Sequence, residues 1–153
     1  MWFLKRIISK ILKKMVISAG LRMFVLMRFT LGKEERLKSK KLIGRLYEEG
    51  KVIKVFPLRM VYIQTEHTSK FPAQVGVSVP KRNFKKAVDR NRIKRLLRET
   101  YRKEKHTIYE TVDKPYVFMI SYLARDEWKY ADLEHKMKKL LTQFITEVTQ
   151  DEK

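Results

Sequence analysis

Basic side chains recur at helical spacing between Ala87 and Lys105, and their guanidinium groups are suited to binding phosphate. With a period of 3.6 residues, the stretch places apolar side chains on one face: Ile93, Leu96, Leu97 and Tyr101. Polar and cationic side chains cover most of the remaining surface: Asn91, Lys94, Arg95, Arg98, Arg102 and Lys105. Because guanidinium groups pair bidentately with phosphate oxygens and stack on bases, this pattern predicts a helix that binds a polyanion. A solvated surface helix in a very basic protein is the alternative interpretation.

Aromatic side chains accompany these cationic residues, and the combination is typical of proteins that bind single-stranded nucleic acid. Tyr47 and Tyr62 fall on predicted regular elements, and Phe84 lies just before the central helix. Any one of these rings, considered alone, would more often be a core residue. The hypothesis of base stacking therefore depends on their occurring with the cationic helix.

No arrangement of residues suggests catalysis by protein side chains. His67, His106 and His135 are far apart in the sequence and do not form a metal-binding pattern such as HExxH. Asp126 and Glu127 are adjacent, but they fall in a predicted turn, where solvated acidic residues are common. A nuclease that worked without a partner would need clustered acidic residues to hold metal ions. The sequence therefore favours a binding protein over a protein-only nuclease.

Length, charge and cysteine content limit the class of protein. The chain has 153 residues, which is enough for one domain with a hydrophobic core. It contains 36 Lys and Arg against 17 Asp and Glu, and the formal net charge of +19 indicates nucleic acid or an anionic membrane as partner. The absence of cysteine excludes a disulfide framework, a thiolate zinc site and a cysteine nucleophile. It also fits a reducing compartment, so we expect a cytoplasmic protein.

Residues 1–28 differ in composition from the rest of the chain. They predict an amphipathic helix with one apolar and one basic face, in which charges interrupt every apolar run before the roughly 20 residues that a membrane span needs. Such a helix could lie on a membrane surface through residues 1–15. We instead expect a dispensable extension or a misassigned start, with Met23 or Met27 as the first residue in place of Met1.

Hydrophobic periodicity predicts an α+β domain at 29–149, followed by a frayed tail at 150–153. The predicted elements are a helix capped by Ser39 and ended by Gly50, strands at 52–56, 58–65 and 73–79, a helix at 87–105, a strand at 116–123 and a helix from 130 to about 148. The stretch 107–114 reads as a polar turn. In the third strand, Gly76 and Ser78 leave one side of the sheet open to another molecule, unless a helix packs there.

The stretch Gly76–Arg102, GVSVPKRNFKKAVDRNRIKRLLRETYR, closely resembles the signature of the bacterial ribonuclease P protein subunit. The family pattern is a strand end G-[LV]-S-[VI]-x-[KR] followed by AVxRNRxKRxxRE. A looser likeness extends from Phe29 to about Val148: RLKSKKLIGRLYEEGK resembles the family's first helix, and PYVFMISYLARDEWKYADLEHKMKKLL resembles its last strand and helix. Residues 1–28 have no counterpart in the family, which favours a downstream start.

The resemblance implies an αβββαβα fold with a four-stranded sheet, like ribosomal protein S5 domain 2. A left-handed βαβ crossover, against the usual right-handed rule, would carry the RNR segment. The resemblance places these residues against the catalytic RNA of the enzyme: Arg90, Asn91, Arg92, Lys94, Arg95 and Arg98. Lys81 and Arg82 of the preceding basic loop, with Arg102 of the helix, complete the predicted RNA-binding set.

The resemblance also implies a second binding surface. Proteins of this family hold the 5′ leader of precursor tRNA in a cleft between the first helix and the sheet, and alignment assigns Ile43, Tyr47 and Tyr62 to that cleft. The family usually has an aromatic residue at the position of Ile43, so this chain would lack one stacking contact.

The implied activity is removal of 5′ leaders from precursor tRNA by a ribonucleoprotein endonuclease. Its RNA subunit would perform the hydrolysis with Mg²⁺ bound mainly by the RNA, so no catalytic or metal-binding protein residue is expected. The expected partners are ribonuclease P RNA and the precursor leader, with no obligate protein partner. The alternative is a general RNA-binding or ribosome-associated protein without a role in tRNA maturation.

Overall fold

Four strands form one mixed sheet in the computed structural model, which describes residues 30–152. The strands are β1 (Lys51–Val55), β2 (Leu58–Gln64), β3 (Ala73–Ser78) and β4 (Tyr116–Tyr122), and they lie in the order β1-β2-β4-β3. Strand β2 pairs antiparallel with both β1 and β4, whereas β3 and β4 are parallel. Each predicted strand is confirmed to within one residue at either end.

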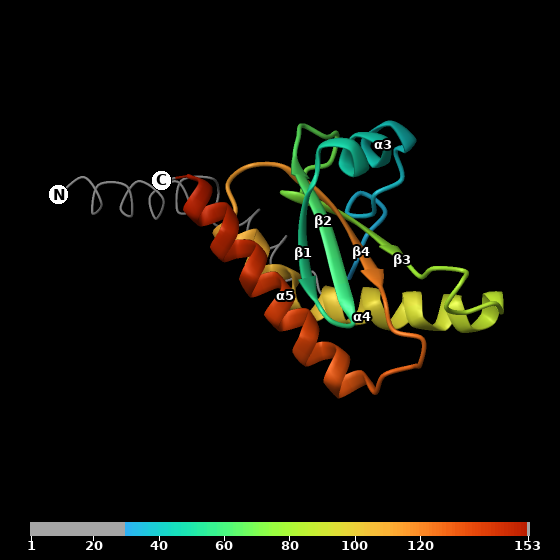
Figure 1. Ribbon diagram of the computed structural model, residues 1–153. Helices are drawn as coiled ribbons and strands as arrows, with labels where there is room; N and C mark the ends of the chain where they lie inside the picture. The colour runs from blue at the N-terminus through green and yellow to red at the C-terminus, as the bar shows by residue number, and fades with distance from the viewer. Residues whose placement is uncertain (1–29, 153) are drawn as a thin grey trace. The chain divides into compact units, whose positions relative to one another are not determined.

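Three helices complete this part of the chain: α3 (Lys40–Glu49), α4 (Ala87–Thr111) and α5 (Tyr130–Asp151). Helix α4 connects the parallel strands β3 and β4, so the predicted α+β order and the helical crossover are confirmed. In Figure 1, α3 lies beside one end of the strands, and the N-terminal half of α4 extends past β3. Residues 31–152 belong to one compact unit. The predictions for residues 1–28 lie outside the described residues.

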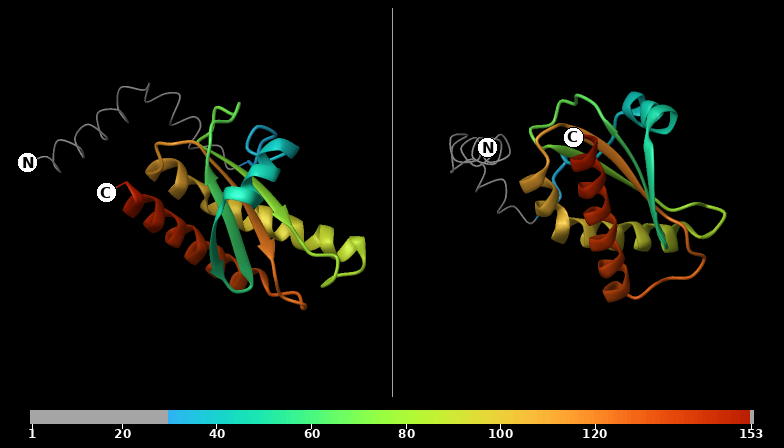
Figure 2. Two further views of the ribbon diagram at one scale, coloured as in Figure 1. Left: turned by 45° about the horizontal axis from the view of Figure 1, so that its top comes forward. Right: turned by 60° about the vertical axis from the view of Figure 1, so that its left-hand side comes forward.

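Helices α4 and α5 lie on one face of the sheet and α3 lies on the other (Figure 2). An apolar cluster holds the helices on each face. The larger cluster lies between the sheet and helices α4 and α5, where Tyr101 of α4 and Phe144 of α5 both pack edge-on against aromatic rings of the strands. The smaller cluster lies under α3 and is centred on Leu46. Strand residues alternate between the two clusters, as the period of a β-strand requires.

The ends of α3 are formed by local contacts that the sequence predicts. The Ser39 hydroxyl accepts a hydrogen bond from the Leu42 amide at 3.4 Å, and the Gly50 amide donates to the Leu46 carbonyl at 3.0 Å. Gly50 has no positive φ. A Cβ at this position would overlap the Leu46 carbonyl oxygen and lie 2.6 Å from Cγ1 of Val61, so close packing requires the glycine.

Two helices are longer than predicted. The prediction of a turn at 107–114 is wrong, because α4 continues to Thr111. Buried Ile108 extends the apolar stripe, and the hydroxyls of Thr107 and Thr111 donate to main-chain carbonyls of the preceding turn at 2.7 and 2.8 Å. Helix α5 continues to Asp151 instead of fraying from 150, and the Asp151 carboxylate pairs with Lys51.

Candidate nucleic-acid interface

Helix α3 covers only part of its face of the sheet. Leu46 packs onto Val61 of β2 and onto Val117 and Met119 of β4. These contacts lie toward the end of β2 that leads to Gln64. The opposite end of the same face carries no residue of the smaller apolar cluster, within the part of the chain that the structure describes.

A row of polar residues crosses the sheet at that opposite end. Cross-strand pairing aligns Ser78 of β3, Ser121 of β4, Arg59 of β2 and Lys54 of β1, which we call the polar row. The hydroxyl oxygens of Ser78 and Ser121 are 3.0 Å apart. The buried Nε of Arg59 has no hydrogen-bond partner among residues 30–152. Sequence alternation places Arg59 beside Val61 on this face, but it cannot show which residues of other strands are its neighbours.

Ile43 and Tyr47 lie one turn apart on the flank of α3 nearer the polar row. On the other flank, Arg45 Nη1 donates to the Thr65 hydroxyl at 3.0 Å, just beyond the far end of β2. Residues two apart in a helix differ by about 200° in direction, so Tyr47 points away from Thr65. The Tyr47 side chain is 52% exposed, whereas Ile43 is half-buried against the smaller cluster. Tyr47 is therefore accessible for stacking.

The prediction that Tyr62 shares this surface is wrong. Its side chain is 3% exposed and lies in the larger cluster, on the opposite face of the sheet. Its ring packs edge-on against Phe144 at a centroid distance of 4.9 Å, and its hydroxyl donates to Glu147 at 3.0 Å. Burial, assisted by Glu147, raises the pKa of Tyr62. Tyr62 thus stabilises the packing of α5, and Phe84 is likewise packed, with its ring 6.0 Å from that of Tyr122.

A cavity of about 350 Å³ opens at the other end of the sheet, between α3, β2 and α5. Its lining includes Tyr62 but neither Ile43 nor Tyr47. Its charged walls are paired, since Lys51 contacts Asp151 and Lys114 lies 3.6 Å from Glu152. The paired charges make this cavity a poorer match for a polyanion than the polar row.

Several basic residues of α4 are occupied by contacts within the protein. The guanidinium of Arg90 donates to the carbonyls of Phe84 and Lys85 at 2.8 and 2.7 Å, and so holds the loop that precedes the helix. Arg92 pairs with Glu127. Arg102 pairs with Glu99, and the hydrogen bond from Arg102 is the main cause of the lowered Glu99 pKa.

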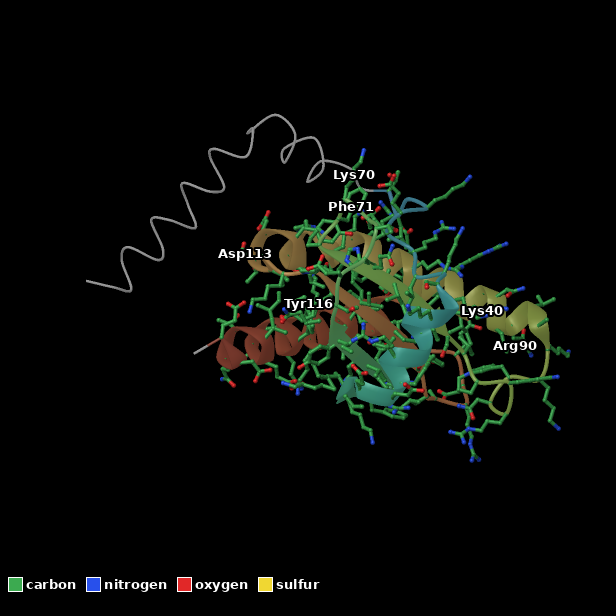
Figure 3. The ribbon with its side chains drawn as sticks, turned by 90° about the horizontal axis from the view of Figure 1, so that it is seen from above. Lys40, Lys70, Phe71, Arg90, Asp113 and Tyr116 are labelled. Carbon is green, nitrogen blue, oxygen red and sulfur yellow. The ribbon has the colours of Figure 1, made fainter. Side chains whose placement is uncertain are left out.

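The middle of α4 presents basic residues without such partners. Lys94, Arg95 and Arg98 make no salt bridge within residues 30–152. Asn91 and Arg95 are exposed, as are Lys81 and Arg82 in the preceding loop. In Figure 3, the labelled Lys40 and Arg90 lie on one side of the molecule and Asp113 and Tyr116 on the other. The surface of α4 from Asn91 to Arg98 is therefore the best candidate for phosphate contacts.

The prediction that Lys105 belongs to this cationic face is wrong. Its side chain is 3% exposed, and Nζ pairs with Glu35 at 2.5 Å. Sequence spacing missed this because Glu35 lies 70 residues away.

Two further observations bear on the class of site. Among residues 30–152, no group of three His, Cys, Asp or Glu side chains is arranged to hold a metal ion. In the same range, no helix combines the length and the apolar character that crossing a bilayer requires.

Comparison with known proteins identifies a family. The family model described as Ribonuclease P matches residues 31–145. The ribonuclease P protein component of Porphyromonas gingivalis is 41% identical over 91 residues, which span 59% of this chain and 66%, just under two thirds, of that relative. The corresponding protein of Syntrophus aciditrophicus is 32% identical over 124 residues, which span 81% of this chain and 98% of that relative.

Solved structures show the same fold at lower sequence identity. The RNase P protein of Staphylococcus aureus superposes with a TM-score of 0.56 at 20% identity, over 71% of this chain and 93% of that one. The RNase P protein of Thermotoga maritima gives 0.58 at 19% identity, over 71% and 96% of the two chains.

Proposed function

The chain belongs to the ribonuclease P protein family, and we propose that it is the protein subunit of the ribonucleoprotein that removes 5′ leaders from precursor tRNA. Its partners are ribonuclease P RNA and the precursor leader, it needs no further protein, and it acts in the cytoplasm. The observation that carries this proposal is the stretch of α4 where Lys94, Arg95 and Arg98 have no acidic partner among residues 30–152, while the opposite stripe of the helix is buried.

The role assigned to α4 is electrostatic. Each phosphate that a lysine or arginine neutralises releases counterions, so RNA affinity should fall steeply with added salt. Arg92 can also contribute, because its exposed pair with Glu127 is worth at most about 1 kcal/mol and can open. Arg90 instead preserves the shape of the loop that carries Lys81 and Arg82.

The role assigned to the polar row and Tyr47 is to hold the single-stranded leader. Hydroxyl and cationic groups contact the sugar-phosphate backbone, and an exposed ring stacks on a base of any identity. Contacts of this kind are largely indifferent to sequence, as an enzyme that processes many precursors requires. The hydrolysis is carried by the RNA, with Mg²⁺ held mainly by RNA phosphates, while protein cations reduce the repulsion between leader and RNA.

Reconstituted cleavage tests this proposal. The chain, mixed with ribonuclease P RNA at low Mg²⁺, should cleave precursor tRNA much faster in single turnover than the RNA alone. The double variant Arg95→Ala/Arg98→Ala should lose most of this stimulation. Lys136→Ala/Lys139→Ala removes the same charge from α5 and should retain it. Equal rates with and without the chain, or cleavage by the chain without RNA, would contradict the proposal.

A further inference from the structure

The segment before α3 forms an additional edge of the sheet. Arg36 pairs in parallel register with Val75 of β3. The Leu37 amide donates to the Val75 carbonyl at 2.9 Å, and the Val75 amide donates to the Glu35 carbonyl at 2.8 Å. The Gln74 side chain adds a hydrogen bond of 3.0 Å to the Glu34 carbonyl. The main chain on both sides of Arg36 is therefore held by the sheet.

A buried ionic network ties the same segment to α4. The Glu35 carboxylate accepts hydrogen bonds from Lys105 Nζ and the Tyr109 hydroxyl, both at 2.5 Å, and from the Gly32 amide at 2.7 Å. The side chains of Glu35 and Lys105 are only 2% and 3% exposed. A buried charge pair holds its geometry when further donors satisfy its oxygens, as they do here. The position of this segment relative to α4 is thereby fixed.

The register of the edge directs Arg36 toward α4. Residues paired across neighbouring strands point to the same face, and the Val75 side chain lies in the larger cluster, which packs on α4 and α5. Burial lowers the pKa of Arg98, and the nearby charges of Arg36 and Arg95 lower it further. None of these three arginines makes a salt bridge with any residue in the range 30–152.

We propose that Arg36, Arg95 and Arg98 form one phosphate-binding site, to which the edge segment supplies Arg36 and the Glu35–Lys105 pair positions it. This inference rests on the proposed function in one respect: the proposed function identifies the bound phosphate as part of the backbone of ribonuclease P RNA. The guanidinium groups come from two elements, the edge segment and α4, and the charges of Arg36 and Arg95 both act on Arg98. Each guanidinium offers a planar fork that matches phosphate oxygens. A bound phosphate relieves the mutual repulsion of the cluster, which no acidic residue of the described chain neutralises.

The site also explains why α4 buries one of its lysines. Lys105 lies on the same helix as Arg95 and Arg98, so its pair with Glu35 connects the edge segment to the helix that carries the other two arginines. An isolated α4 peptide would lack Arg36 and would not reproduce the site.

A double-mutant cycle on RNA affinity tests the shared site. The variants are Arg36→Ala, Arg98→Ala and their combination, with Lys139→Ala, an exposed residue of α5, as the charge-matched control. Affinity is measured for ribonuclease P RNA and for an unrelated structured RNA of equal length. A charge-assisted contact predicts that Arg36→Ala weakens binding of both RNAs by about tenfold, and the combination by clearly less than the product of the single effects. Arg36→Lys should give an intermediate loss.

Each outcome decides the inference. Loss no greater than that of Lys139→Ala would overturn it, and so would additive losses, because additivity means that Arg36 and Arg98 contact separate phosphates. Equal affinity of the wild-type chain for both RNAs would contradict the proposed function. The comparison of Arg36→Ala with Lys139→Ala would still test the phosphate-binding site in that case.

The positioning role of the buried pair has its own readout. Removing Glu35 alone threatens folding, so Glu35→Gln is combined with Lys105→Met, which removes both charges. In this background, Arg36→Ala should change RNA affinity by less than about threefold, because the guanidinium is no longer held in place. A purely structural pair would lower the melting temperature and leave the tenfold effect of Arg36→Ala intact, and that result would overturn the positioning role.

Discussion

Replacing Tyr47 with alanine should weaken binding of leader-bearing precursor tRNA and leave mature tRNA largely unaffected. The ring is 52% exposed on the flank of α3 nearer the polar row. Base stacking on an aromatic side chain is worth about 1–3 kcal/mol, which corresponds to a loss of roughly 5- to 150-fold in affinity. Because half of the ring is already in solvent, the cost to folding should be only about 1 kcal/mol.

The assay compares the affinity of the reconstituted holoenzyme for the two tRNAs at one salt concentration. Tyr47→Phe is the matched control, because it keeps the ring and removes only the hydroxyl, and it should bind like the wild type. The stacking interpretation fails if Tyr47→Ala weakens both tRNAs by the same factor, or if Tyr47→Phe is as weak as Tyr47→Ala.

Three other changes give distinct results. Gly50→Ala should lower the free energy of unfolding by about 1–3 kcal/mol, because its Cβ would overlap the Leu46 carbonyl. Gly44→Ala should raise the same free energy by about 1 kcal/mol, because no described atom lies within 4 Å of the added Cβ. Chemical denaturation measures both changes. Arg102→Ala should reduce the salt dependence of RNA binding less than Arg95→Ala does, because Glu99 already pairs with Arg102; equal slopes would contradict this ranking. Glu35→Gln should destabilise the fold by about 3–5 kcal/mol, measured by thermal unfolding, because it leaves a buried lysine uncompensated, and a loss below about 1 kcal/mol would be inconsistent with the ion pair.

Local chemistry made the order of elements predictable. Alternating apolar residues define β2 and β3, Ser39 caps α3, and the apolar stripe of α4 is continuous from Ile93 to Tyr101. The sequence predicts that the stripe ends at Tyr101, because the next buried position on that face is Lys105, which is a polar residue in a hydrophobic pattern. Its pairing with the distant Glu35 allows it to be buried, and sequence periodicity cannot show that pairing, so the sequence did not predict the last turns of α4.

The sequence predicted the kind of site, a cationic surface for RNA, but not which residues form it. Composition and spacing identified a cationic helix, yet the structure separates Arg90, which holds a loop, from Arg95, which has no acidic partner in the described chain. Tyr62 was placed on the wrong face because alignment gives its position along the strand and not the helix that packs against it. Arg36 was missed since a single arginine before a helix has no periodic signal, and its role follows from pairing with Val75.

The account assigns two RNAs to two surfaces, and directed cleavage from single cysteines can test this division. The chain has no cysteine, so one introduced cysteine carries the only probe. An iron chelate is attached at Gly44→Cys on α3, at Val88→Cys near the start of α4, where the side chain is 76% exposed, or at Lys139→Cys on α5.

In the assembled holoenzyme, hydroxyl radicals from the α3 probe should cut the precursor leader, radicals from the α4 probe should cut ribonuclease P RNA, and the α5 probe should cut neither strongly. Cuts from the α3 and α4 probes at the same RNA positions, or the strongest cuts from α5, would contradict the assignment of the two surfaces.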